Sequence, residues 1–301
     1  METQIKGTKQ SISIKNYWNS LNLESMLPFF SIRRTHLIAA LIASSLVGEL
    51  PFLGNRIAQA QIGVSPMVIE KQAQRGQAQG TLKIRNPTNQ PTRARMYTEA
   101  FTYDPKTGFK VISESEQNLS PYLRFSPREM TIPPGESRRV RFIAQLPLDM
   151  EKGEYRTVIF TETLIERTDN QGRQFGIQAR IGATVYVRVG DIAPELTVKK
   201  ASYNAQEQEI ELLASNSGKA SARVKVDWTL KQQGETIAEG EAPETTVIAQ
   251  RDRVLSWGLP EKAPDSLVSG TYQLNGKLIW GAGENPNTLP FDVKFKIPAN
   301  E

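Results

Sequence analysis

The chain has 301 residues, of which 23% are charged and 39% hydrophobic, and its formal net charge at pH 7 is +5. This composition is ordinary for a globular protein and excludes an intrinsically disordered chain and a membrane protein with many spans. The length suits about two domains of roughly 100 to 200 residues each. The chain has no cysteine, so hydrophobic cores rather than disulfides must hold the folds.

The first sixty residues have the order of parts of a secretory signal peptide. Arg33 and Arg34 precede an apolar run at 37–47, and the small residues Ala58 and Ala60 stand before Gln61. We expect export by the general secretion route and cleavage before Gln61. The apolar run is too short for the roughly 20 residues that span a bilayer, so no membrane span should remain after cleavage. Met26 also begins a complete basic leader and is an alternative start.

Cleavage would leave a nearly neutral protein with few catalytic options. Residues 1–60 hold six Lys or Arg and three acidic residues, so their removal lowers the net charge from +5 to +2. Phosphate binding needs a dense basic face, and we therefore expect no nucleic-acid partner. The only histidine, His36, is in the leader, which excludes Ser-His-Asp triads and Cys/His zinc sites. We expect a protein that is not an enzyme, with no catalytic residue, no metal and no cofactor.

From Gln61 onward, short alternating segments broken by Pro, Gly and Asn predict an all-β fold. Explicit turn sequences occur at 86–89, 133–135 and 169–172. A boundary is expected near Gly190, where a long strand ends and a new series begins at Leu196. The predicted strands include 80–85, 92–101, 137–143, 155–161 and 178–189 in the first half, and 209–213, 222–230, 245–248, 253–257, 270–274, 277–280 and 291–297 in the second.

About seven strands in each half is what an immunoglobulin-like β-sandwich requires. The sequence therefore predicts a leader at 1–60 followed by two immunoglobulin-like β-sandwich domains, at 61–190 and 191–301.

The first half resembles the periplasmic chaperones of the chaperone-usher pilus pathway. Five motifs carry the resemblance, in the order and spacing of the family: 64–69, 82–88, 123–127, 132–141 and 146–151. The resemblance implies a periplasmic molecular chaperone that binds and caps secreted pilus or surface-structure subunits. Such chaperones add a strand of their own at an open sheet edge. The implied partners are secreted pilin-like or surface protein subunits, with an outer-membrane usher as a further candidate.

A strand that pairs with a client needs alternating apolar side chains, and the segment from 177 supplies them. We expect Ile177, Ala179 and Ile181 to face the client, with Arg180 between them, while 183–189 face the protein's own core. The first strand near 64–69 should flank the same groove through Met67 and Ile69.

The sequence departs from the family at the two cations that anchor the client's terminal carboxylate. The family's arginine in the first strand falls on Met67 and its lysine in the last strand falls near Ala183, so neither cation is present. Losing both should weaken this charge-assisted capture. Arg180 and Arg188 are candidate substitutes, although an exposed arginine on a strand is usually only solvated. The segment between the last two strands, 167–174, is also short.

The alternative function is a non-catalytic extracytoplasmic adhesion or carbohydrate-binding module with the same folds. Such a module would need exposed aromatic side chains. Aromatic residues in sandwiches are more often part of the core. The candidates for such a platform are Tyr97, Phe101, Tyr103, Trp228, Trp257 and Trp280.

Overall fold

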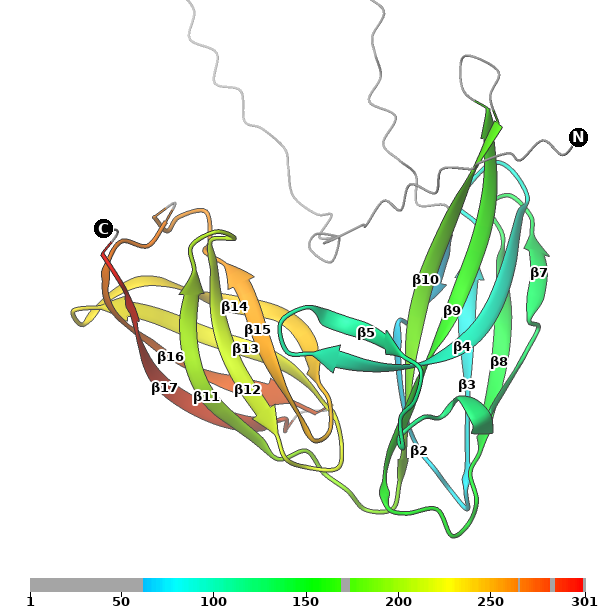
Figure 1. The fold of residues 1–301 in the computed structure, drawn as a ribbon, viewed down its shortest axis with the longest axis horizontal. Helices are drawn as coiled ribbons and strands as arrows, with labels where there is room; N and C mark the ends of the chain where they lie inside the picture. Colours follow the sequence, from blue (N-terminus) through cyan, green and yellow to red (C-terminus); the bar gives the residue numbers. More distant parts are fainter. Residues whose placement is uncertain (1–61, 169–173, 265, 282–284, 300–301) are drawn as a thin grey trace, which may run out of the picture. The chain divides into compact units, whose positions relative to one another are not determined.

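In the computed structural model, residues 62–168, 174–264, 266–281 and 285–299 are described, and nearly all their regular structure is β-strand (Figure 1). The exception is a short 3-10 helix, η1 (Ser120–Tyr122). The all-β fold class is thereby confirmed. Within these ranges no helix is long and apolar enough to cross a membrane. The predicted cleavage residues Ala58, Ala60 and Gln61 lie outside the described residues.

The first half of the chain forms two packed sheets. One sheet has the order β1-β3-β8-β6 and the other β2-β10-β9-β4-β5, with β7 paired to β4. Leu82 and Phe142 from the first sheet share one hydrophobic core with Ile159 and Val185 from the second. The strands are β1 (Gly63–Ser65), β2 (Val68–Gln72), β3 (Gln77–Arg85), β4 (Thr92–Asp104), β5 (Gly108–Ile112), β6 (Leu123–Ser126), β7 (Glu129–Ile132), β8 (Ser137–Gln145), β9 (Gly153–Thr168) and β10 (Gln174–Val189).

The predicted first strand at 64–69 is two strands in different sheets. β1 pairs with β3, whereas β2 runs parallel to β10 in the opposite sheet. Pro66 stands between them, and because proline has no N–H it interrupts the ladder at the point where the chain changes sheet.

The second half also forms two sheets, with the orders β11-β12-β15 and β14-β13-β16-β17. No described strand is shared with the sheets of the first half. The division of the chain near Gly190 stays a prediction. The strands are β11 (Leu196–Asn204), β12 (Glu209–Asn216), β13 (Ala222–Gln232), β14 (Glu235–Val247), β15 (Arg251–Gly258), β16 (Gly270–Trp280) and β17 (Asn287–Ile297).

Two predicted strands, 270–274 and 277–280, form the single strand β16. Gly276 continues the ladder, paired with Trp228 on one side and Phe291 on the other. A Cβ atom at Gly276 would lie 2.2 Å from the backbone oxygen of Asp227 and 2.7 Å from Cζ of Phe291. The glycine is therefore required by close packing within a strand, and the predicted division into two strands was wrong.

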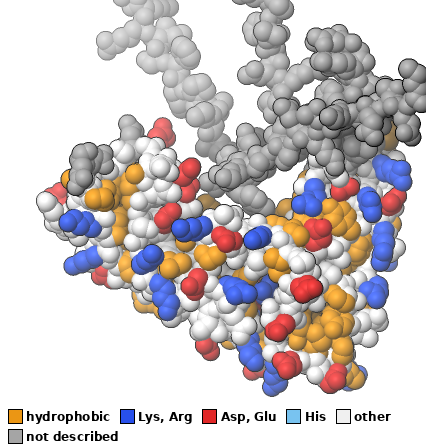
Figure 2. Space-filling model, viewed as in Figure 1, with side chains coloured by type: hydrophobic (Ala, Val, Ile, Leu, Met, Phe, Trp, Pro, Cys, Tyr) orange, Lys and Arg blue, Asp and Glu red, His pale blue; other side chains and the backbone are white. Residues whose placement is uncertain are grey.

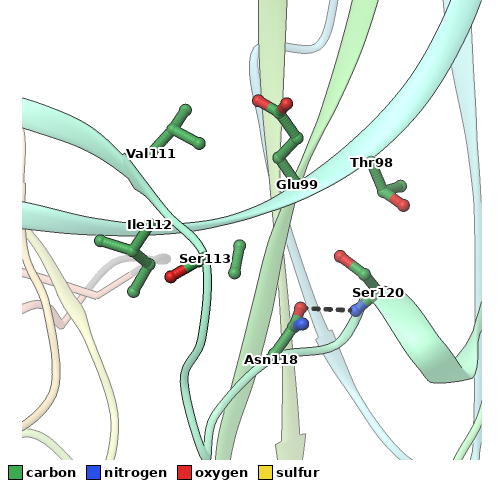
Figure 3. Close-up of a pocket in the computed structure, with 8 residues that line it drawn as sticks. Thr98, Glu99, Val111, Ile112, Ser113, Asn118 and Ser120 are labelled. Carbon is green, nitrogen blue, oxygen red and sulfur yellow. Dashed lines mark hydrogen bonds between the residues drawn. The ribbon is translucent and has the colours of Figure 1, made fainter.

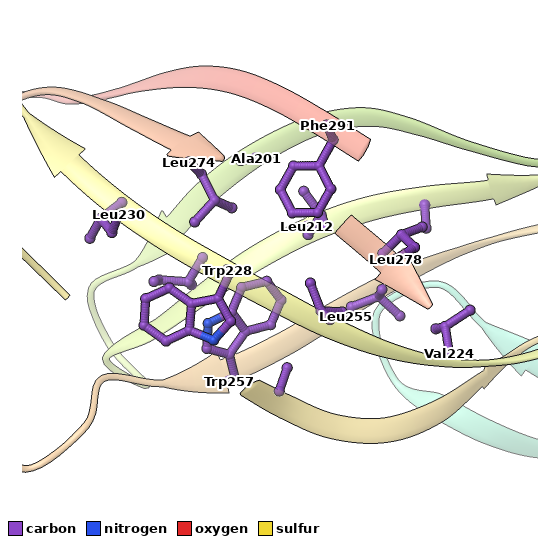
Figure 4. Packing of buried hydrophobic residues seen from close by; sticks show 14 of the residues in the cluster. Ala201, Leu212, Val224, Trp228, Leu230, Leu255, Trp257, Leu274, Leu278 and Phe291 are labelled. Atoms are coloured by element: carbon purple, nitrogen blue, oxygen red, sulfur yellow. The ribbon is translucent and has the colours of Figure 1, made fainter. Parts of the chain in front are cut away.

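Tryptophan side chains pack among aliphatic residues in the core of the second sandwich (Figure 4). Trp228 and Trp257 are each 4% exposed, and their ring centroids are 5.7 Å apart. Trp280 is half-buried against the same cluster. These tryptophans therefore do not form the exposed platform that a carbohydrate-binding module needs.

Each sandwich contains a buried asparagine that closes a turn in the same way. Asn86 follows β3, and its Nδ2 donates hydrogen bonds to the backbone oxygens of Gln90 (2.7 Å) and Ile132 (2.9 Å). Asn216 ends β12, and its Nδ2 donates to the backbone oxygens of Ala220 (2.8 Å) and Val247 (3.1 Å). In each case Oδ1 accepts the N–H two residues further along the chain. These amides satisfy backbone carbonyls that the turn would otherwise leave without partners.

Candidate functional site: the open edge of strand β10

Strand β10 is paired along its whole length on one side only. Its partner β9 runs beside it from Thr168, opposite Gln174, to Gly153, opposite Val189. On the other side, β2 covers only the segment 184–188. No strand in the described part of the chain pairs with this side of 174–183. The half of β10 next to the hairpin is thus an unpaired sheet edge.

The hydrogen bonds at the covered end identify the backbone groups that this edge presents. The N–H of Thr184 donates to the backbone oxygen of Met67 (2.9 Å), and the N–H of Ala73 donates to that of Arg188 (2.8 Å). Alternate residues of a strand direct their N–H and C=O groups to the same neighbour. Residues 178, 180 and 182 therefore present these groups at the unpaired edge, where they form a template for one more strand.

On the core side of the sheet, the apolar row of β10 becomes more exposed toward the hairpin. Ala183 is fully buried, whereas Ile181 and Ala179 are half-buried, and Ile181 still contacts the core cluster. The backbone of Ile177 pairs with that of Ile165, but its side chain lies outside the described ones. Ala179 and Ile181 thus extend the apolar row of β10 beyond the residues that are buried in the core of the sandwich.

On the opposite side of the sheet, Arg180 is held by its neighbours. Its Nη1 donates to Oη of Tyr97 (3.3 Å) and lies 3.6 Å from Oε2 of Glu99. Its Cζ is 4.2 Å from the ring centroid of Phe160, a cation–π distance. Arg180 is therefore not a free cation at the edge.

The neighbouring glycine makes room for this arrangement. A Cβ atom at Gly182 would lie 2.7 Å from Cγ2 of Val158 and 2.9 Å from Cε1 of Phe160. Because Gly182 has no side chain, Val158 and Phe160 pack across β10 and support the arginine.

Arg188, the other candidate substitute for the missing cations, is also engaged. Its Nε lies 3.5 Å from Oε2 of Glu154, whose side chain is fully buried, and its Nη2 lies 3.8 Å from Oε1 of Glu70. Burial raises the pKa of Glu70, while the nearby charge of Arg188 lowers it. Arg188 thus balances the negative charge of acidic groups in its own sheet.

Met67 and Ile69 contribute less side-chain surface than the sequence suggested. Ile69 is 6% exposed and belongs to the core. The side chain of Met67 is half-buried against that core, while its backbone oxygen accepts the hydrogen bond from Thr184. Met67 is therefore the point at which the protein's own chain stops covering β10.

Sequence reasoning missed Arg156, in the middle of β9. It is 4% exposed, and neither Nε nor Nη1 has a hydrogen-bond partner among the described residues. Burial lowers its pKa. The signal was present, because one arginine interrupts the apolar segment 155–160. Since both nitrogen atoms are shut off from solvent, a client carboxylate does not reach them in this conformation.

A pocket of about 500 Å³ lies beside β4 and β5 (Figure 3). Its lining includes Glu99, Val111 and Ile112, and Oδ1 of Asn118 accepts the N–H of Ser120 (2.9 Å). The described chain contains no group of three or more His, Cys, Asp or Glu placed to hold a metal ion. With one carboxylate among hydroxyl and aliphatic groups, the pocket offers no acid–base pair.

No protein-family model matches the chain, and no curated protein matches it. Solved structures do match. The class 5 fimbriae chaperone CfaA is 15% identical with a TM-score of 0.45, and the match covers 79% of this chain and 99% of that chain. The chain resembles the fimbrial chaperones.

Two further chaperone structures extend the comparison. A chain in the complex of the Salmonella enterica SafA pilin with the SafB chaperone is 12% identical, with a TM-score of 0.44 over 76% of this chain and 96% of that chain. A chain in the CsuC–CsuE chaperone–tip adhesion subunit complex of Acinetobacter baumannii is 14% identical, with a TM-score of 0.42 over 77% and 98%.

Proposed function

We propose that this chaperone-like chain binds and caps secreted subunits by β-strand addition, in which the unpaired edge of β10 pairs with a strand of the client. The observation that carries the proposal is the incomplete cover of that edge, since β2 ends its pairing at Thr184 and leaves 174–183 without a partner in the described chain. Exposed sheet edges pair readily with extended segments of other chains. The predicted leader would deliver the protein to the periplasm, where secreted pilin-like or surface subunits are its clients and an outer-membrane usher is a further candidate partner.

In this proposal, affinity comes from the backbone and the apolar row rather than from a charged anchor. Arg180 and Arg188 are both engaged with carboxylates of their own sandwich. Ala179 and Ile181 offer an apolar surface next to the unpaired N–H and C=O groups. A client segment would add main-chain hydrogen bonds and bury its own alternating apolar side chains against this row.

The sharpest test removes one backbone donor from the edge. Gln178 is exposed, and its N–H faces the unpaired side, so Gln178→Pro removes a donor to the client without removing a hydrogen bond to β9. Gln178→Ala is the matched control, because it shortens the same side chain and keeps the N–H. Substitution of Ile181 by Asp is a less clean test, because Ile181 contacts the core and the change would also cost stability.

Client contact is measured by photo-crosslinking in the periplasm with a photoreactive phenylalanine analogue at position 179, and with the same analogue at position 296 as the background. We expect a discrete crosslinked subunit at position 179, retained in Gln178→Ala and lost in Gln178→Pro. The proposal fails if Gln178→Pro retains the crosslink, or if positions 179 and 296 capture the same proteins.

A further inference from the structure

The sheet β1-β3-β8-β6 carries cations on its outer face and no acidic residue. Its four strands contain six Lys or Arg and no Asp or Glu. Buried and exposed residues alternate along β3 and β8, with Leu82, Ile84, Val140 and Phe142 in the core. Five exposed cations share the outward face, which we call the basic face: Lys83, Arg85, Arg124, Arg139 and Arg141.

The strand register places these cations close together. Lys83 lies directly opposite Arg139, and Arg141 lies opposite Ser126, two residues from Arg124. Like charges directly opposite each other destabilise a pair of strands. No ion pair joins these five residues to an acidic group in the described chain, although the same sandwich pairs Arg93 with Glu129 (2.7 Å) and Arg138 with Glu136 (2.6 Å).

The basic face was not expected from the sequence. The net charge after cleavage is only +2, and the cations come from segments near 83, 124 and 140 that the fold brings into one sheet. The expectation that the mature chain lacks a dense basic face is therefore wrong for this sheet. On the face drawn in Figure 2, acidic and basic side chains are intermixed over much of the surface, with Lys and Arg frequent along the right-hand margin.

The composition of the basic face limits the kind of anion that fits it. The exposed large hydrophobic residues of the described chain are Phe109, Leu148 and Val268, and none of them lies in these four strands. None of its exposed residues is therefore an aromatic residue that could stack on a sugar ring or a large apolar residue that could enter hydrocarbon, and Ile143 on the same face is half-buried. An extended sheet surface with cations on three adjacent strands matches a broad anionic surface better than a single narrow ligand.

We propose that the basic face docks the protein peripherally on a bilayer rich in anionic phospholipid, through attraction to lipid phosphates and without insertion. Each Lys or Arg near such a surface strengthens binding by about fivefold. Salt screens the attraction, because the Debye length falls from about 10 Å at 0.1 M to about 3 Å at 1 M. This docking is separate from the edge of β10 and does not depend on client binding.

The test is co-sedimentation of the purified chain with vesicles of equal parts phosphatidylglycerol and phosphatidylcholine, compared with phosphatidylcholine alone. The variant is Arg139→Glu with Arg141→Glu. The matched control is Lys294→Glu with Lys296→Glu, at two exposed positions of β17, which changes the net charge by the same amount. Circular dichroism and thermal unfolding check that both variants are folded.

We expect binding to the anionic vesicles only, lost at 1 M salt, at least about thirtyfold weaker in the β8 variant and nearly unchanged in the β17 control. Equal loss in both variants, binding that persists at 1 M salt or equal binding to phosphatidylcholine would overturn the proposal. Retention on immobilised heparin without vesicle binding would also overturn it, in favour of a soluble polyanion.

Discussion

Lys83 and Arg139 lie directly opposite each other in β3 and β8, both exposed and both without an acidic partner in the described chain. A cross-strand pair of like charges lowers the stability of a sheet, and the position could hold a neutral or acidic residue without disturbing the core. The pair therefore lowers the stability of the folded protein. A role of these cations in binding would explain why both are present.

Arg139→Glu should raise the free energy of unfolding by about 0.5 kcal/mol, because it replaces repulsion across the strands with attraction. Arg139→Gln should give a smaller gain. Urea unfolding at low ionic strength measures the free energy of unfolding of both variants. The gain of each variant over the wild type should shrink in high salt, which screens the charges. A loss of stability in Arg139→Glu would show that the arginine makes a favourable contact that outweighs the repulsion.

Gly182→Ala should destabilise the first sandwich by about 1 to 3 kcal/mol, because the new methyl group would overlap Val158 and Phe160. Gly153→Ala is the control, since a Cβ atom there meets nothing within 4 Å. Urea midpoints compare the two. Similar midpoints for both variants would mean that Phe160 moves aside without cost, and Arg180 would then lose its support.

Asn86→Ala and Asn216→Ala should each cost about 2 to 3 kcal/mol, because each leaves two backbone carbonyls without the amide that satisfied them. Thermal unfolding followed by circular dichroism measures the loss. If the two sandwiches unfold in separate transitions, each variant should lower only the transition of its own sandwich. A change of less than 0.5 kcal/mol, on the order of a neutral surface substitution, would mean that water replaces the amide.

The dependence of stability on pH should include a contribution from Glu70. Burial raises the pKa of its carboxyl above the usual 4.5, so the folded protein holds the proton more tightly than the unfolded chain. This contribution is fully present below the ordinary pKa of 4.5 and is lost as the pH rises through the folded pKa. Glu70→Gln should therefore lose less stability than the wild type between pH 4.5 and 7.

Urea midpoints at several pH values measure the effect, and Glu129→Gln is a useful comparison. Glu129 is an exposed residue whose pKa is lowered by its hydrogen bond to Arg93. Its contribution therefore has the opposite sign, being lost as the pH falls. Identical pH slopes for the wild type and Glu70→Gln would contradict the assignment.

The alternation of apolar and polar residues was sufficient to predict the all-β fold and most strands. The pattern at 80–85 places Leu82 and Ile84 in the core, and the turn at Asn86 is where the sequence predicts it. Such features depend on neighbours along one strand, because successive side chains point to opposite faces. The predicted division of 270–280 into two strands was wrong, because Gly276 continues β16 and its close contacts come from neighbouring strands.

The proposed function depends on which strands become neighbours, and only the tertiary structure decided that. The apolar row at 177–181 was visible in the sequence, but not that β2 would end its cover at Thr184 or that Tyr97, Glu99 and Phe160 would hold Arg180. Likewise, Lys83 and Arg139 are distant in the chain and opposite each other in the sheet. Sheet edges and charged faces arise from pairing between remote segments, and the periodicity of a single segment carries no record of that pairing.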